Sequence, residues 1–85
     1  MTQDEFAAAQ ARVKTLTARP PNDRLLSLYA LFKQGSMGDV QGKRPGMMDF
    51  KGRAKYDAWA TKRGVSQEDA RAAYVSLVDQ LVNAD

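Results

Sequence analysis

The chain contains neither cysteine nor histidine among its 85 residues. Without cysteine it can form no disulfide bond, no thiolate metal site and no cysteine nucleophile. Without histidine it also lacks the side chain that most often serves as a general base or metal ligand. Catalysis by carboxylates or lysine alone stays open, but these absences favour a binding protein over an enzyme.

Long apolar runs are missing as well. The richest run, Leu25 to Phe32, is interrupted by Ser27 and falls far short of the roughly 20 residues that span a bilayer. The N-terminal stretch MTQDEFAAAQ is acidic where a secretory signal would be basic. We therefore expect a cytoplasmic protein without stable membrane insertion, folded as a single domain over residues 1–85.

The net charge of +3 is unevenly distributed. Residues 1–42 carry a net charge of +1, residues 43–63 carry +5 and residues 64–85 carry −3. A positive segment of this kind favours an anionic partner. From charge alone, however, a solvated basic surface is the simpler interpretation.

The first two helices are predicted from caps, apolar spacing and breakers. Thr2 and Glu5 have the spacing of a capping box, and an apolar stripe follows at intervals of three and four residues. Pro20 and Pro21 exclude further helix, and Asn22 is predicted to cap the second helix. The stripe of the first helix consists of Phe6, Ala9, Val13 and Leu16.

The second helix is apolar over more than half of its circumference, which indicates a central position in a bundle, an exposed apolar strip, or both. Gly35 and Gly38 are expected to loosen it, and glycine and proline then maintain a long non-helical connection as far as Asp49. Its apolar residues are Leu25, Leu26, Leu28, Tyr29, Leu31 and Phe32.

The last two helices have clearer starts. Asp49 is predicted to cap a helix over about residues 50–63 that ends at Gly64. Ser66 and Asp69 resemble a capping box before the most regular apolar stripe in the chain. Nothing alternates with a period of two, so we predict an all-α four-helix bundle. The last stripe contains Ala70, Ala73, Tyr74, Leu77, Val78 and Leu81.

Cations in the first turn of the third helix point to anion binding. Lys51 and Arg53 oppose the helix macrodipole there, yet together with free backbone N–H groups they would suit a phosphate. Tyr29 and Lys33, like Lys51 and Lys55, are four residues apart and can share a helix face. Solvated lysines are the simpler interpretation on this evidence alone.

Two motifs in the right order resemble those of the acyl-CoA-binding protein family. The first is YxxFKQ…GD from Tyr29 to Asp39, and the second is RPGxxDFKGxAKxDxW from Arg44 to Trp59. The resemblance extends from Phe6 to Val82, although Tyr56 stands where tryptophan is usual. It implies an up-down-down-up bundle with a long overhand loop between helices two and three. It also implies non-catalytic binding of medium- to long-chain fatty acyl-CoA, and an intracellular acyl-CoA carrier and pool former without a cofactor.

The resemblance also implies the site. Its head-group residues would be Lys14, Tyr29, Lys33, Lys51, Lys55 and Tyr74. Its acyl-chain groove would be bordered by Phe6, Ala9, Val13, Leu25, Leu26, Ala30, Leu31 and Phe32. By pattern alone, Tyr74 is equally well a core residue, and Lys14 and Lys51 are equally well solvated.

Two other functions remain open at this point. The basic segment 43–63 is compatible with nucleic-acid binding, although its helix lacks a base-reading set of side chains, so we expect no nucleic-acid partner. The apolar face of the second helix is also compatible with a helical protein-interaction module. Because the apolar stripes are consumed by one core, we expect a monomer.

Overall fold

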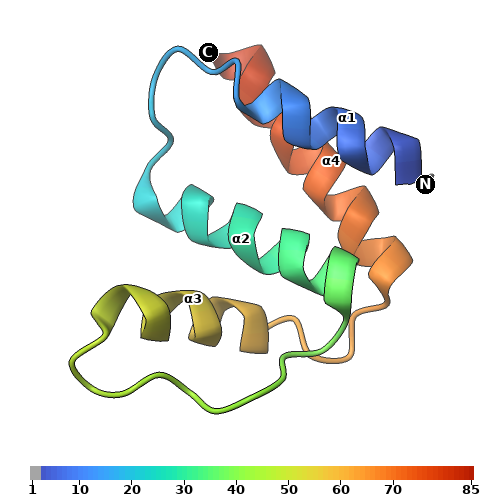
Figure 1. The fold of residues 1–85 in the computed structure, drawn as a ribbon. Coiled ribbons are helices and arrows are strands. Elements are labelled where there is room, and N and C mark those ends of the chain that lie inside the picture. The colour runs from blue at the N-terminus through green and yellow to red at the C-terminus, as the bar shows by residue number, and fades with distance from the viewer. Residues whose placement is uncertain (1–2) are drawn as a thin grey trace.

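The computed structural model describes residues 3–85, which form four α-helices and no strand. The helices are α1 (Gln3–Val13), α2 (Asn22–Met37), α3 (Phe50–Ala60) and α4 (Gln67–Ala84). α2 and α3 run in one direction and α1 and α4 in the other, and residues 38–49 return the chain to the start of α3 (Figure 1). The predicted all-α fold with an overhand connection is confirmed. The predicted capping role of Thr2 lies outside the described residues.

α2 is the central helix. It packs against α4 on one side and α3 on the other, and α1 packs against α4 (Figure 1). The molecule is correspondingly flat, with extents of 36 × 28 × 15 Å. The broad apolar surface of α2 is explained by this position, because two of its faces need a packing partner.

The core lies where α1, α2 and α4 meet. Phe6 is 1% exposed, and its ring makes an edge-to-face contact with Tyr74 at 5.2 Å between centroids. Phe32 stacks on Phe6 at 6.0 Å. These rings join the three helices although α1 and α2 do not pack backbone to backbone. The buried cluster consists of Phe6, Ala9, Leu28, Leu31, Tyr74, Leu77 and Val78.

Two predicted caps are confirmed and one is wrong. The Gly52 N–H donates to Asp49 Oδ1 at 3.0 Å, and the Asp69 N–H donates to Ser66 Oγ at 3.0 Å. Asn22 does not cap α2, because it is already the first helical residue. Its side-chain oxygen instead accepts a hydrogen bond from Arg19 Nη1 at 3.1 Å.

Two predicted helix ends also need correction. Gly35 does not loosen α2, which continues to Met37 and stops at Gly38 with φ +83°. Gly35 is buried, and its carbonyl accepts from Arg71 Nε at 2.8 Å, so tertiary contacts override its weak helix propensity. α3 ends at Ala60 rather than near residue 63, because the next backbone bonds run to the third residue back.

The connection 38–49 is fixed along α3. Trp59 Nε1 donates to the Gly38 carbonyl at 2.8 Å, and the Tyr56 hydroxyl donates to the Gly42 carbonyl at 3.0 Å. Arg44 forms a bidentate ion pair with Asp57 at 2.8 and 2.6 Å. Arg44 is therefore not part of a diffuse positive field, as its position in the basic segment suggested, because Asp57 neutralises it.

Two residues of the FKQ…GD motif, Gln34 and Asp39, join separate segments of the chain. Gln34 is fully buried and its amide nitrogen donates to Asp39 Oδ1 at 2.8 Å and to the Val65 carbonyl at 2.7 Å. The same Asp39 oxygen accepts from the Gly64 N–H at 2.9 Å. These bonds lower the pKa of Asp39, and the Gly64 N–H contributes most. They join the end of α2 to the segment between α3 and α4.

Candidate functional site

Two clefts adjoin along α2. The first has a volume of about 500 Å³ and lies between the segment that follows α1, the N-terminal half of α2, and α4. The second, of about 570 Å³, lies between α2 and α3. Arg19, Leu25 and Tyr29 line both clefts, so the two are neighbours on one surface. The first cleft is completed by Val13, Leu16, Ala18, Pro20, Leu28, Phe32 and Tyr74, and the second by Asn22, Leu26, Phe50, Lys51, Ala54 and Lys55.

The first cleft is walled by aromatic rings. Tyr29 and Phe32 enter it from α2, and Tyr74 enters it from α4. The Tyr74 ring is only 5% exposed, and burial raises its hydroxyl pKa above the ordinary value of 10.0. The hydroxyl therefore remains protonated near neutral pH and can donate a hydrogen bond. A cleft of this kind suits a flat ring system that carries polar atoms.

The second cleft combines apolar surface with lysines. Leu26 and Ala54 face it from opposite helices, and Lys51 and Lys55 line it from α3. Both lysines are exposed, and Lys55 Nζ lies 5.5 Å from the centroid of the Tyr29 ring. A lysine stem can cover apolar surface while its ammonium group reaches water. This cleft therefore suits a ligand with both an alkyl portion and negative charge.

Lys33 lies beside Trp59, at 5.0 Å from its ring. Tyr29 and Lys33, one helical turn apart on α2, thus each make their cation–π contact with α3 rather than with one another. Because α2 and α3 run in the same direction (Figure 1), a step of four residues along α2 is matched by a step of four residues along α3. Tyr29 and Lys55 are therefore brought together beside the two clefts, whereas Lys33, one turn further along α2, lines neither cleft.

Other predicted site residues lie elsewhere. Lys14 is exposed in the turn after α1 and lines neither cleft. Four of the predicted groove residues are core residues that line neither cleft: Phe6, Ala9, Ala30 and Leu31, at 1, 0, 1 and 8% exposure. The remaining groove residues, Val13, Leu25, Leu26 and Phe32, do line one or both clefts. The binding roles of all these residues stay predictions.

Arg19 is the cation that the sequence patterns missed. It lines both clefts and is held toward Asn22 by its hydrogen bond. It lies in an irregular segment before two prolines, where no helical period marks which way a side chain points. Phe50, an exposed aromatic residue at the start of α3, was also missed.

The N-terminus of α3 offers less to an anion than the sequence suggested. Asp49 already supplies a carboxylate oxygen to the Gly52 N–H, so part of the positive end of the helix is satisfied internally. Attraction of an anion here falls mainly to the side chains of Lys51 and Lys55. Within residues 3–85, no three carboxylates gather as a metal site would require.

Comparison with known proteins gives a consistent result. The family model described as acyl-CoA-binding protein matches residues 3–78. An acyl-CoA-binding protein homolog 1 from Caenorhabditis elegans is 54% identical over 77 residues, which are 91% of this chain and 90% of that protein. A Drosophila melanogaster acyl-CoA-binding protein homolog is 48% identical over 82 residues, covering 96% of this chain and 95% of that one.

Solved structures agree with the sequence relatives. Oryza sativa acyl-CoA-binding protein 2 superposes with a TM-score of 0.93 at 40% identity, over 96% of this chain and 89% of its own. An ACBP from Moniliophthora perniciosa superposes with a TM-score of 0.91 at 38% identity, over 99% of this chain and 83% of its own. The chain belongs to the acyl-CoA-binding protein family.

Proposed function

We propose that this protein binds medium- to long-chain fatty acyl-CoA thioesters without converting them, and so serves as an intracellular carrier and pool former. Members of this family are non-catalytic binding proteins. The observation that carries the proposal is the pair of adjoining clefts, one aromatic and one combining apolar surface with lysines. A CoA thioester has matching parts: a purine ring, phosphate groups and an alkyl chain.

The two clefts support a specific placement of the ligand. The adenine ring would enter the aromatic cleft between Tyr29 and Tyr74, where stacking and a hydroxyl donor are available. The phosphates would lie where the two clefts meet, within reach of Lys33 and Lys55. The acyl chain would follow the second cleft, along Leu26 and its neighbours.

This placement of the acyl chain uses only some of the groove residues that the family resemblance implied. Phe6 and Ala9 are at most 1% exposed, so neither side chain is available to an alkyl chain unless the core opens. Leu25 and Leu26, by contrast, are only partly buried and line the second cleft. We therefore assign the chain to the α2–α3 side of the molecule.

The two parts of the ligand contribute differently. A charge-assisted hydrogen bond to phosphate contributes roughly 1.5–3 kcal/mol, whereas burial contributes about 0.8 kcal/mol for each methylene. A tail of about 15 methylenes gives a gross term of about 12 kcal/mol, which ordering of the ligand then reduces. The chain should thus dominate affinity, and the lysines should dominate selection of the CoA head group.

Titration calorimetry with palmitoyl-CoA, free palmitate and free CoA tests the proposal. We expect tight binding of the thioester and much weaker binding of either fragment. Equal affinity for palmitoyl-CoA and CoA would refute the assigned role of the chain. No binding of palmitoyl-CoA, together with binding of a duplex oligonucleotide, would refute the proposed function itself.

We further propose a cytoplasmic monomer in which residues 1–85 form one acyl-CoA-binding domain. The single core shared by α1, α2 and α4 supports this view. Within residues 3–85, no helix combines the length and the apolar character needed to cross a bilayer. Sedimentation equilibrium with and without palmitoyl-CoA should return the mass of one chain, and a doubled mass would refute the monomer.

A further inference from the structure

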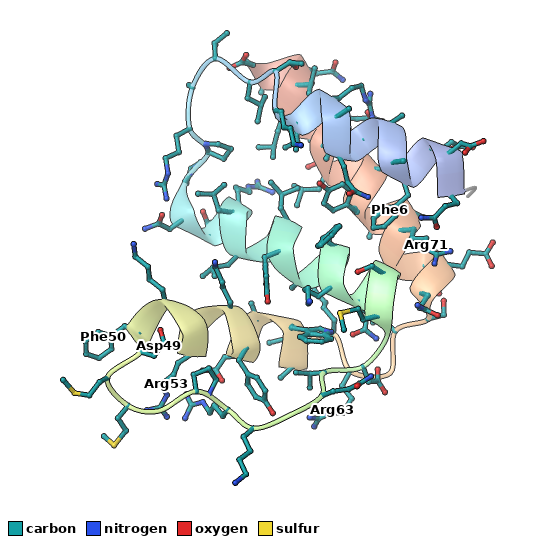
Figure 2. The ribbon with its side chains drawn as sticks, viewed as in Figure 1. Phe6, Asp49, Phe50, Arg53, Arg63 and Arg71 are labelled. Carbon is teal, nitrogen blue, oxygen red and sulfur yellow. The ribbon has the colours of Figure 1, made fainter. Side chains whose placement is uncertain are left out.

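Three large apolar side chains are exposed at one tip of the molecule. Met47, Met48 and Phe50 are 76, 88 and 75% exposed, more than any other large apolar residue in the part of the chain that the structure describes. Figure 2 shows Phe50 pointing away from the helices at the outer end of α3. We call Met47, Met48 and Phe50 the apolar tip. Single exposed apolar residues are ordinary, but three within four consecutive positions of the chain indicate an interaction site.

The local backbone does not require these residue types. The Asp49 N–H donates to the Gly46 carbonyl at 3.0 Å, so Met47 and Met48 are the two central residues of a tight turn. Such positions usually carry small or polar residues. The two thioether side chains therefore contribute little to folding, and a partner outside the chain would explain them.

Positive charge flanks the apolar tip. Lys43 and Lys51 flank it in the sequence and are exposed. The acidic groups of segment 43–63 are both engaged: Asp49 accepts from the Gly52 N–H, and Asp57 is paired with Arg44. An anionic surface that approaches the tip would thus meet uncompensated lysines. Charge complementarity and apolar content together describe the interface of an anionic membrane.

We propose that the apolar tip and its flanking lysines form a reversible docking surface for anionic lipid bilayers. Met47, Met48 and Phe50 would enter the interfacial layer while Lys43 and Lys51 contact lipid phosphates. Flexible, unbranched methionine side chains adapt to a disordered surface. A nucleic acid could stack on Phe50 alone, but it would leave the two methionines without a role. The contact is peripheral and involves no membrane-spanning segment.

The docking surface continues into the ligand site. Phe50 and Lys51 also line the second cleft, opposite Leu26. A protein resting on its apolar tip would therefore present the opening of this cleft to the lipid interface. Acyl-CoA, an anionic amphiphile, partitions into that interface. This last step depends on the proposed function, whereas the docking itself does not.

Vesicle binding without acyl-CoA tests the docking. The native chain should sediment with vesicles containing about 30% phosphatidylserine and much less with neutral phosphatidylcholine vesicles. Changing Met47→Ser and Met48→Ser together should reduce the partition coefficient about tenfold or more. These two residues line neither cleft, so palmitoyl-CoA binding in vesicle-free buffer should be unchanged.

Met37 provides the matched control. It is 50% exposed at the last residue of α2, and because α2 and α3 run in the same direction it lies at the opposite end of the α2–α3 pair from the apolar tip. Met37→Ser should change the partition coefficient by less than about twofold. An equal loss from Met37→Ser, or unchanged binding after the double substitution, would overturn the proposal.

A site-specific probe separates insertion from simple charge attraction. Because the chain has no cysteine, Met48→Cys and Met37→Cys can each carry a single environment-sensitive fluorophore. Anionic vesicles should shift the emission to the blue for the probe at position 48 only. Vesicle binding without that shift, binding of a duplex oligonucleotide in place of vesicles, or no vesicle binding would each refute the docking surface. If the native chain docks but fails to bind palmitoyl-CoA, the proposed function falls and the docking surface stands.

Discussion

Lys55 provides the most direct test of the head-group site, through the substitution Lys55→Met. Methionine keeps a flexible apolar stem against the second cleft and has similar helix propensity, so the change removes mainly the ammonium group. Lys55 Nζ lies 5.5 Å from the Tyr29 ring at the boundary of the two clefts. Loss of one charge-assisted hydrogen bond to phosphate, roughly 1.5–3 kcal/mol, should raise the Kd for palmitoyl-CoA roughly 10- to 150-fold.

Stability should change far less than affinity. Lys55 is exposed, and an exposed cation–π contact contributes about 0.5–1 kcal/mol. Lys43→Met is the matched control, because Lys43 is an exposed lysine of the same basic segment that lines neither cleft. Calorimetry and thermal melting should be run on the native chain and both variants.

The ligand can be varied as well as the protein. If Lys55 contacts the 3′-phosphate of the ribose, palmitoyl-CoA that lacks this phosphate should bind the native chain and Lys55→Met with nearly equal affinity. A loss that is the same for both ligands would place Lys55 on another phosphate. A change in Kd of less than about threefold, or equal losses for Lys43→Met and Lys55→Met, would refute the reasoning.

Three further predictions concern the cleft, the core and pH. Arg19→Gln should raise the Kd for palmitoyl-CoA about three- to tenfold with little change in melting temperature; an unchanged Kd in calorimetry would remove Arg19 from the site. Trp59→Phe should lower the free energy of unfolding in urea by about 2–4 kcal/mol, because it removes both buried volume and the hydrogen bond to Gly38; a loss below about 1 kcal/mol would contradict this packing. The pKa of Asp39 is lowered in the folded state. Its contribution to the free energy of unfolding is therefore complete above the ordinary pKa of 3.8 and is lost as the pH falls through the lower folded-state pKa. Below about pH 4, the melting temperature should therefore decrease more steeply with falling pH for the native chain than for Asp39→Asn. Parallel plots of melting temperature against pH would exclude Asp39 as a source of the acid sensitivity.

Helices were predictable where local rules and tertiary packing agree. The caps at Asp49 and Ser66 act through neighbouring backbone groups, so sequence alone locates them. Gly35 was misread because its helical state depends on residues far along the chain. A Cβ added there would lie 3.0 Å from Arg71 Cγ and 3.2 Å from Phe6 Cζ. The close approach of α4 and of the Phe6 side chain to α2 thus explains a glycine that propensity would place at a helix end.

The site was predictable in composition but not in arrangement. Helical spacing grouped Tyr29 with Lys33 on one face, yet their cationic and aromatic partners come from α3. Such pairings depend on the relative direction and height of two helices, which no local period encodes. The predicted groove residues Phe6 and Ala30 are apolar at the correct spacing, but a stripe does not distinguish core from cleft wall. Burial against neighbouring helices makes that distinction.

The position of α3 has a consequence for local stability. Among the helices of residues 3–85, α3 packs on α2 alone, and its other ties are hydrogen bonds to the connection 38–49. A helix with a single packing partner can open while the other three stay closed, so its amides should exchange hydrogen faster than those of α4. An acyl chain between α2 and α3 would contact both the helix that opens and the helix from which it separates. The protein would then close this weakly protected helix by taking up ligand, and amide exchange in α3 would report whether the carrier is loaded.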